Sequence, residues 1–360
     1  MSQKLLIINP GSTSTKLAVF DGQTKLVQEN IEHDAAQIAK FDKIAEQVPF
    51  RTSVILDFLS KNNINVNDLS AVVGRGGILF GLNAGGYVVN DDLVTALGDE
   101  NLSSPHASNM GGMLAKEFAN QANIPAYIYD AVTGGELPEV ATVTGFPEVI
   151  RSSTSHLLNS HAMAVKYAKS IGRKYSDLNL IIAHIGGGVS VSAHSKGKLI
   201  DSVGDDEGHF SPERSGTIPQ LSLIELCYSN EYTKDEMKKK IRGKGGMYAH
   251  LGTSDCRKIE EMIENGDKHA KLVYEAEALQ IAKSIGLLSV TEKGKTDAII
   301  LTGGVAHSKM LTEKIEEYVS FIAPVVVLPG ENEMEALAFG GLRILNGEEE
   351  AHVYHHLPNN

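Results

Sequence analysis

Two segments of this chain, about half its length apart, carry the same pattern of residues. Residues 4–11 read KLLIINPG and residues 179–186 read NLIIAHIG, each an apolar strand followed by a polar residue, one spacer and glycine. Each continues into a second strand and a hairpin dipeptide, Asp21-Gly22 or Lys196-Gly197. Positions 9 and 184, 11 and 186, and 22 and 197 all differ by 175. This constant offset predicts a duplicated β-hairpin unit in two similar halves.

Apolar strands alternate with amphipathic helical stretches along the chain, which is typical of an α/β fold. Strands are expected at residues 4–8, 17–20, 71–73, 126–129, 180–184, 189–194, 298–301 and 325–328. Helices are expected at residues 51–62, 109–122, 155–171, 219–229, 269–290, 308–321 and 333–346, with 269–290 as a long interdomain helix. The 360 residues suffice for two domains. We place them at 1–149 and 150–335, with a C-terminal helix, 336–360, packing back on the first.

Several classes of protein do not fit the composition. The net charge of −12 argues against a nucleic-acid partner, which needs clustered Lys and Arg, and the run 238–240 (KKK) is expected to be a solvated helix face. No apolar run reaches the ~18 residues that span a bilayer, and no signal peptide is evident, so a cytoplasmic protein without a membrane partner is expected. Cys227 and Cys256 have no metal-site spacing. No GxxxxGK[ST], GxGxxG, HExxH or GxSxG motif occurs.

The turn after each repeated strand is rich in small residues, whose backbone N–H groups can cradle phosphate oxygens. Asn9, Ser12, Ser14 and Lys16 surround the first turn, and this residue chemistry favours a phosphate site over a plain hairpin. Two such domains are expected to face each other across a central cleft.

Residues 6–16, LIINPGSTSTK, resemble the first signature of the acetate kinase family, and residues 182–190, IAHIGGGVS, resemble its second phosphate-binding segment. Further similar blocks follow in family order at residues 74–77 (GRGG), 129–130 (YD), 153–156 (STSH), 212–216 (PERSG), 301–305 (LTGGV) and 329–333 (PGENE). Residues 204–216 and the short length are most similar to the butyrate kinases of this family. The resemblance implies two acetokinase-type domains of the actin, sugar-kinase and Hsp70 ATPase fold, the second carrying nucleotide-binding elements.

The activity that the resemblance implies is reversible transfer of the ATP γ-phosphoryl group to butanoate, giving butanoyl phosphate and ADP. A carboxylate is already ionised at neutral pH, so the site needs cations and hydrogen-bond donors rather than a general base. Arg75 lies after an apolar strand and Arg214 in a Gly/Pro/Ser loop, and both resemble active-site arginines of the family. Their planar guanidinium groups suit carboxylate and phosphate.

The other implied catalytic residues are two histidines and an aspartate. His156 and His184 resemble family histidines near the transferred phosphate, and Asp130 ends an apolar strand, where ligand crevices form in α/β sheets. Asp130 and Glu333 are expected to help bind Mg²⁺. The run Glu-Asn-Glu-Met-Glu leaves Glu331 and Glu335 open as alternatives to Glu333.

Glycines mark the remaining expected contacts. The resemblance implies that Gly186, Gly187 and Gly188 bind phosphate and that Gly303 and Gly304 lie against adenosine. Gly77, where acetate kinases carry a bulkier residue, is expected to leave room for a four- or five-carbon acyl chain.

Three alternatives stay open. The chain could prefer branched acids, or it could be an acetate or propionate kinase; from another class, an ATP-binding sensor-like module shares the fold. A homodimer or higher homo-oligomer is expected.

Overall fold

The computed structural model describes residues 2–99, 101–204 and 207–355, and the chain divides into two compact units. The first unit combines residues 1–134 with residues 332–360, and the second comprises residues 135–331. The sequence analysis placed these boundaries later, at 149/150 and 335/336. Each unit has its own sheet and its own apolar core.

The first unit is built on a seven-stranded mixed sheet with the strand order β12-β5-β6-β4-β1-β2-β3. The hairpin strands β1, β2 and β3 pair antiparallel, whereas β1, β4 and β6 run parallel. The strands are β1 (Lys4–Pro10), β2 (Ser14–Asp21), β3 (Thr24–Glu32), β4 (Ala71–Arg75), β5 (Gly86–Val88), β6 (Ala126–Tyr129) and β12 (His352–Val353).

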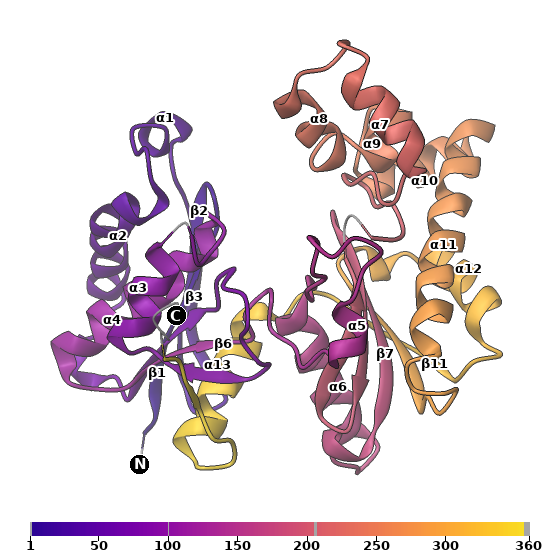
Figure 1. Cartoon of the computed structure of the whole chain (residues 1–360). Helices are drawn as coiled ribbons and strands as arrows, with labels where there is room; N and C mark the ends of the chain where they lie inside the picture. The colour runs from indigo at the N-terminus through magenta and orange to yellow at the C-terminus, as the bar shows by residue number, and fades with distance from the viewer. Residues whose placement is uncertain (1, 100, 205–206, 356–360) are drawn as a thin grey trace. The chain divides into compact units, whose positions relative to one another are not determined.

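Helices cover both faces of this sheet (Figure 1). Leu6 and Ile8 of β1 point into a core shared with α2 and α4, while their neighbour Leu5 lies on the opposite face beside Gly341 of α13. This alternation follows from the two-residue period of a strand and explains why β1 is apolar on both sides. The helices are α1 (Ala35–Ile38), α2 (Val48–Lys61), α3 (Asp91–Gly98), α4 (Met110–Ala122) and α13 (Glu333–Leu345).

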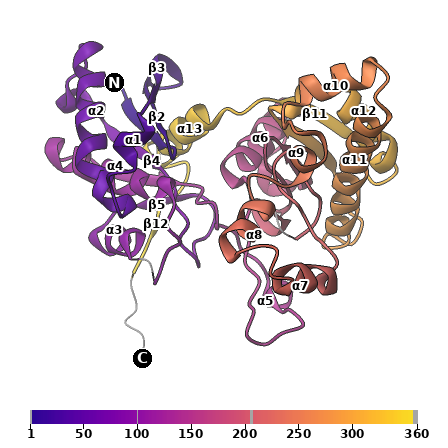
Figure 2. The same cartoon turned by 90° about the horizontal axis from the view of Figure 1, so that it is seen from above.

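The second unit has a five-stranded sheet with the order β11-β10-β7-β8-β9. Its strands are β7 (Asn179–Ile185), β8 (Val189–Ser195), β9 (Lys198–Val203), β10 (Ala298–Gly303) and β11 (Val325–Pro329). Leu180 and Ile182 pack toward α6, whereas Ile181 and Ala183 pack into a core with α11 and α12, which lie side by side (Figure 2). The helices are α5 (Glu139–Thr142), α6 (Leu157–Ser170), α7 (Gln220–Tyr228), α8 (Lys234–Ile241), α9 (Gly246–Leu251), α10 (Cys256–Glu264), α11 (Lys268–Ser289) and α12 (Lys309–Val319).

The predicted duplication is confirmed by the strand topology. The order β3-β2-β1-β4-β6 in the first unit is repeated as β9-β8-β7-β10-β11 in the second, with the same parallel and antiparallel pairings. β1 and β7 span Lys4–Pro10 and Asn179–Ile185, so both ends differ by the 175 residues seen in the sequence. Each of the expected strands lies within an observed one.

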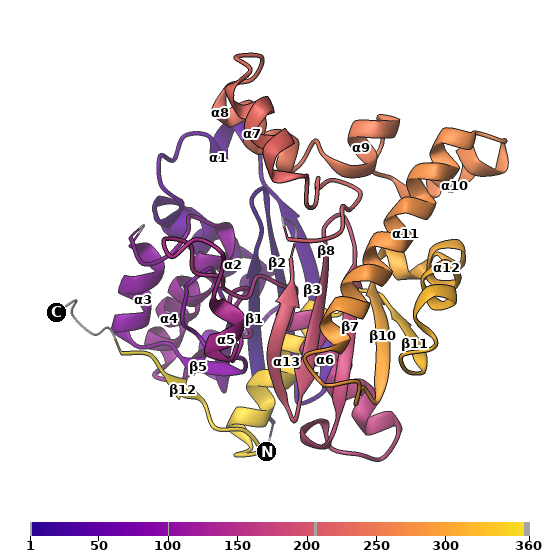
Figure 3. The same cartoon turned by 45° about the vertical axis from the view of Figure 1, so that its right-hand side comes forward.

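Two expectations about helices need correction. The helix expected at 269–290 is α11, but it lies wholly within the second unit, packed along β7 and β8 (Figure 3), and is not an interdomain helix. The C-terminal helix expected at 336–360 ends at Leu345, after which Gly347 has φ +70° and β12 pairs with β5. Residues 356–360 of that range lie outside the described residues.

Some elements carry too little apolar signal to be expected from sequence. β3 exposes most of its polar residues at the sheet edge, and α8 buries only Met237. The lysines at 238–240 do lie on the solvated face of α8, as expected. Across the described ranges, no helix combines the length and the apolar character needed to cross a bilayer.

Glu277 of α11 is the most unusual residue of the second core. Its side chain is fully buried, and neither carboxyl oxygen has a hydrogen-bond partner among the described residues. Burial raises the pKa of the Glu277 carboxyl well above its usual value, so the folded protein holds it neutral.

We predict that Glu277→Gln removes a pH-dependent loss of stability. Below about pH 4.5, Glu277 is protonated in both the folded and the unfolded states. Above this pH, Glu277 ionises in the unfolded state, which lowers the free energy of that state, while in the folded state it stays protonated. The stability of the variant relative to wild type should therefore increase with pH, by up to about 1.4 kcal/mol per unit. Urea unfolding from pH 4.5 to 8 measures this.

Glu275→Gln is the matched control, because Glu275 lies on the same helix but is solvent-exposed beside Lys271. A stability difference between Glu277→Gln and wild type that stays constant over this pH range would contradict the prediction.

Candidate functional site

Three polar residues lie at the carboxyl ends of neighbouring parallel strands in the first unit. Asn9 is near the end of β1, Arg75 ends β4, and Asp130 follows β6. Ile8 pairs with Gly74, and Arg75 pairs with Tyr129, so the three strands end at one sheet edge. Such an edge is where α/β sheets bind ligands.

Asn9, Arg75 and Glu333 form one hydrogen-bonded cluster at this edge. Arg75 Nη1 lies 2.7 Å from Glu333 Oε1, and Asn9 Nδ2 donates to Glu333 Oε2 over 2.8 Å. Arg75 Nη1 also donates to Asn9 Oδ1 at 3.4 Å. Glu333 is the first residue of α13, so the N-terminal end of this helix further favours its negative charge. The structure thus joins residues that are up to 324 positions apart.

Asp130 is buried and has φ +44°, a left-handed conformation that costs energy in a residue other than glycine. Its Oδ1 accepts a 2.8 Å hydrogen bond from Gly85 N, and its own N–H donates to Gly85 O. These bonds hold the strained backbone in place, and such retained strain is common at functional sites.

The glycines around Arg75 are required by close packing. A Cβ on Gly76 would lie 2.6 Å from Ala131 Cα, and a Cβ on Gly77 would lie 2.4 Å from Asn109 Oδ1. Gly77 has no positive φ, so the obstacle to a side chain there is Asn109 rather than the backbone conformation. Within this unit the space beside Gly77 is therefore filled, and its role as acyl pocket stays a prediction.

The first predicted phosphate turn connects β1 and β2. Ser12 is exposed, and Ser14 and Lys16 are partly buried at the start of β2. The turn is closed by a hydrogen bond from Gly11 N to Ser14 O and rests on the buried guanidinium of Arg51, a residue that the sequence analysis did not select.

In the second unit, His184 is part of a buried hydrogen-bond network. Asn159 Nδ2 donates to His184 Nδ1 at 2.9 Å and also to Thr302 Oγ1 at 3.2 Å. With Nδ1 accepting, the neutral ring carries its proton on Nε2, which lies 3.3 Å from Glu331 Oε1. The network therefore presents His184 as a donor on its Nε2 side.

His156 stacks on His184, with ring centroids 4.0 Å apart and an angle of 11° between the rings. Its Nδ1 and its backbone N–H both contact Ser190 Oγ on β8. The structure thus brings together the two histidines that the sequence analysis singled out.

The loop that carries Arg214 is bound to the second glycine turn, Gly186 to Gly188. Ser211 Oγ and Glu213 N both donate to Gly187 O, and Arg214 N donates to Ser211 Oγ. Arg214 Nη1 lies 3.5 Å from Glu213 Oε2. Gly187 is exposed, so the turn is accessible while its position relative to the Arg214 loop is held.

Gly303 ends β10 and Gly304 follows it, but the two glycines differ in their surroundings. Gly303 has φ +92°, and a Cβ there would lie 2.3 Å from Ile185 O, so the position requires glycine. Nothing lies within 4 Å of a Cβ built on Gly304. Open space at Gly304 is compatible with the expected flat adenosine.

The three candidate glutamates are separated by the structure. Glu333 joins the Asn9 and Arg75 cluster, Glu331 lies beside His184 in the other unit, and Glu335 only approaches exposed Lys25 at 3.9 Å. Among the described residues, no three His, Cys, Asp or Glu side chains cluster as a metal site.

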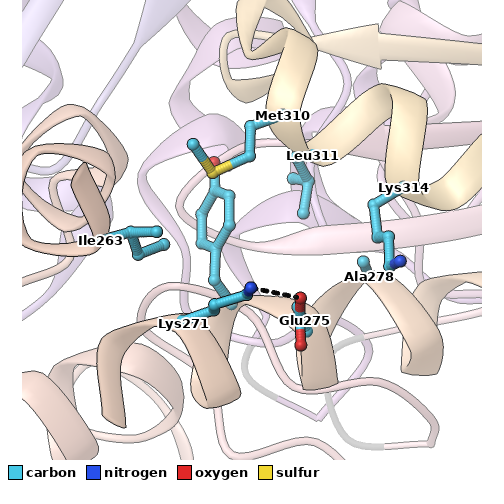
Figure 4. A pocket seen from close by; sticks show the side chains of 8 residues that line it. Ile263, Lys271, Glu275, Ala278, Met310, Leu311 and Lys314 are labelled. Atoms are coloured by element: carbon cyan, nitrogen blue, oxygen red, sulfur yellow. Dashed lines mark ion pairs between the residues drawn. The ribbon is translucent and has the colours of Figure 1, made fainter. Parts of the chain in front are cut away.

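A pocket of about 260 Å³ lies elsewhere in the second unit, between α10, α11 and α12 (Figure 4). Tyr274 and Met310 line it, and an ion pair joins Lys271 to Glu275 at its rim. None of the predicted site residues lines this pocket.

Sequence reasoning missed Arg51, Asn159 and Ser190, which contact the predicted residues from other elements. Asn159 and Ser190 lie in or next to the similar blocks at 153–156 and 182–190, so their position in sequence was a usable signal. Arg51 carries no such signal, because an arginine in an amphipathic helix normally indicates a solvated face.

Comparison with known proteins adds two findings. Residues 148–326, about half of the chain, match the model of the acetokinase family. This segment contains His156, His184, Gly186 to Gly188, Arg214, Gly303 and Gly304.

Solved structures resemble nearly the whole chain. Acetate kinase from Porphyromonas gingivalis is 19% identical with a TM-score of 0.78, covering 95% of this chain and 100% of that one. A propionate kinase from Francisella tularensis subsp. tularensis SCHU S4 is 18% identical with a TM-score of 0.75, covering 94% and 98%. A ROK family protein from Streptococcus pneumoniae TIGR4 in complex with sucrose is 12% identical with a TM-score of 0.52, covering 96% and 100%.

At these identities the structural likenesses show the fold, which is the actin-like ATPase fold expected from the sequence. The match to the acetokinase family is therefore by sequence in residues 148–326, whereas the likeness to solved structures over nearly the whole chain is one of fold.

Proposed function

We propose that this chain is a carboxylate kinase that transfers the γ-phosphoryl group of ATP to a short-chain carboxylate, giving an acyl phosphate and ADP. The observation that carries the proposal is the cluster of Arg75, Asn9 and Glu333 at the sheet edge, in a chain whose other half matches the acetokinase family. Arg75 already binds one carboxylate there, that of Glu333. Among the residues that the structure describes, the buried Nε of the same guanidinium has no hydrogen-bond partner, which supports further binding of an anion.

The chemistry in this proposal needs stabilisation of negative charge rather than proton abstraction. A carboxylate oxygen attacks the γ-phosphorus, the bond from phosphorus to the β,γ-bridging oxygen breaks, and ADP leaves with that electron pair. Arg75 and Arg214 neutralise the charge on the transferred group, and His184 donates from Nε2. This requires that the two units face one cleft, which is part of the proposal.

In this proposal, the two turns of the repeated hairpin bind the phosphate groups. Ser12, Ser14, Lys16 and the amides of the first turn take one group of phosphate oxygens, and Gly186 to Gly188 take another. Gly303 and Gly304 lie against adenosine.

Asp130 and Glu333 fit a role in binding Mg²⁺, because both offer hard oxygen ligands and Glu333 shares its cluster with the amide oxygen of Asn9. Mg²⁺ keeps several waters and needs only one or two protein carboxylates when phosphates supply other oxygens. When bound, the ion neutralises phosphate charge.

Butanoate is the favoured substrate in this proposal, from the likeness of residues 204–216 to butyrate kinases. Asp205 and Asp206 of that segment lie outside the described residues. Branched four- and five-carbon acids are the next candidates, followed by acetate and propionate, the substrates named for the similar structures. A sensor-like ATP-binding module is the alternative from another class.

Trapping the acyl phosphate with hydroxylamine tests the proposal. With ATP and Mg²⁺, the protein should form hydroxamate from carboxylic acids, and kcat/KM should be highest for C4 in a C2 to C6 series. Each methylene that fits the pocket should raise kcat/KM about ten-fold or more.

Each result of the series has a defined meaning. No hydroxamate from any acid would exclude the kinase and favour the sensor-like module. An optimum at C2 or C3 would retain the kinase but overturn butanoate, and a higher value for isobutanoate would favour branched acids.

Arg75→Ala and Arg214→Ala should each lower kcat by about 10²- to 10³-fold, because both side chains act on developing charge. Hydroxamate formation and melting temperature should be measured together. Arg173→Ala is the control, since Arg173 lies in an exposed ion pair with Asp297. Near-normal kcat with an unchanged melting temperature would remove that arginine from the mechanism.

Gly77→Ala tests whether chain length is read at Gly77. The added Cβ meets Asn109, which is held by hydrogen bonds with Ile78 N, Leu97 O and Ser104 O. We therefore expect activity with butanoate and acetate to fall together and their ratio to change less than two-fold. A selective loss of butanoate activity in a folded variant would instead establish Gly77 as part of the acyl pocket.

A further inference from the structure

The guanidinium of Arg51 is completely buried beneath the turn between β1 and β2. It donates five hydrogen bonds, and none of the acceptors is a carboxylate. Nη1 reaches Ser14 O and Thr15 Oγ1, and Nη2 reaches Gly11 O, Ser12 O and Gln47 Oε1, at distances of 2.5 to 3.2 Å.

Within the described part of the chain, this arrangement leaves a buried positive charge without a neutralising carboxylate. Burial lowers the pKa of Arg51 to about 10, so the side chain remains charged at neutral pH. The same charge, together with burial, lowers the pKa of neighbouring His33. A buried charge is costly unless an opposite charge compensates it, and no carboxylate among the described residues pairs with Arg51.

The bonds from Arg51 also orient the peptide groups of the turn. In a trans peptide the C=O of one residue and the N–H of the next point in opposite directions. Because the carbonyls of Gly11 and Ser12 face Arg51, the N–H groups of Ser12 and Thr13 face away from it. Both residues are exposed, and neither N–H donates a hydrogen bond to another group among the described residues.

We infer that Arg51 is the buried countercharge and positioning residue of an anion site on this turn, whose ligand is a phosphate group of the nucleotide. The inference rests on the proposed function for the choice of nucleotide phosphate. The anion contacts the N–H groups of Ser12 and Thr13, while Arg51 holds those groups in place and supplies the compensating charge from below. Arg51 itself does not touch the ligand.

The test is nucleotide binding by Arg51→Met and Arg51→Lys, measured by calorimetry with MgADP. Arg51→Met should weaken binding about 10- to 100-fold, because both the charge and the turn geometry are lost. Arg51→Lys keeps the charge but cannot donate to all five acceptors, so its loss should be intermediate. In the proposed function the carboxylate of the acid substrate contacts residues other than this turn. The KM for ATP should therefore rise more than the KM for the acid.

Gln47→Leu is the matched control. It removes one buried hydrogen bond from Arg51 without touching the turn, and its affinity for MgADP should stay within about three-fold of wild type. Folded Arg51 variants that bind MgADP as tightly as wild type would overturn the inference.

A second measurement uses the wild-type protein, in case neither Arg51 variant folds. With selective ¹⁵N-serine and ¹⁵N-threonine labelling, the Ser12 and Thr13 amide signals should move when inorganic pyrophosphate or MgADP is added. Unmoved signals at saturating ligand would overturn the inference even if hydroxamate is formed. Moved signals without hydroxamate formation from any acid would support the anion site and overturn the proposed kinase.

Discussion

Parallel pairing of β1 with β4 in the first unit, and of β7 with β10 in the second, is the constraint on which the candidate residues of each unit depend. Parallel strands present their carboxyl ends at one edge, and the antiparallel hairpin partner makes its turn at that same edge. In the first unit this brings Asn9 beside Arg75; in the second it sets His184 directly opposite Thr302. Because the same strand pairing is repeated, each unit has one hairpin turn and one set of polar residues at its strand ends.

Buried polar side chains then set the orientation of the groups at these edges. Asn159 spans His184 and Thr302 and selects the proton position on the imidazole, while Ser211 joins the Arg214 loop to the second glycine turn. Buried polar groups are more stable when they are hydrogen-bonded, so these bonds favour the observed positions of His184 and the Arg214 loop. Close backbone contact has the same effect at β4, where a Cβ on Gly74 would lie 2.1 Å from Gly111 O.

Each candidate group that would donate to an anion has a carboxylate nearby. Arg75 pairs with Glu333, Arg214 lies beside Glu213, and His184 Nε2 faces Glu331. In the two arginine pairs, each carboxylate offsets the positive charge of its arginine. In the proposed function, an incoming carboxylate or phosphate would have to share or exchange these partners.

The sequence by itself determined the duplicated hairpin, the positions of the strands around the predicted site and the residue types at the strand ends. These follow from short-range patterns: apolar runs, glycine turns and a constant spacing of 175 residues. It did not determine that Glu333 rather than Glu335 joins Asn9 and Arg75, because residues two positions apart point to different sides of a helix and only packing decides which side faces the cluster. Nor did it reveal Arg51. The burial of Arg51 depends on four hydrogen-bond acceptors in and beside the turn, which lies some forty residues earlier in the chain and folds around the guanidinium. Those contacts join distant segments, and only the tertiary structure decides which side chains meet there.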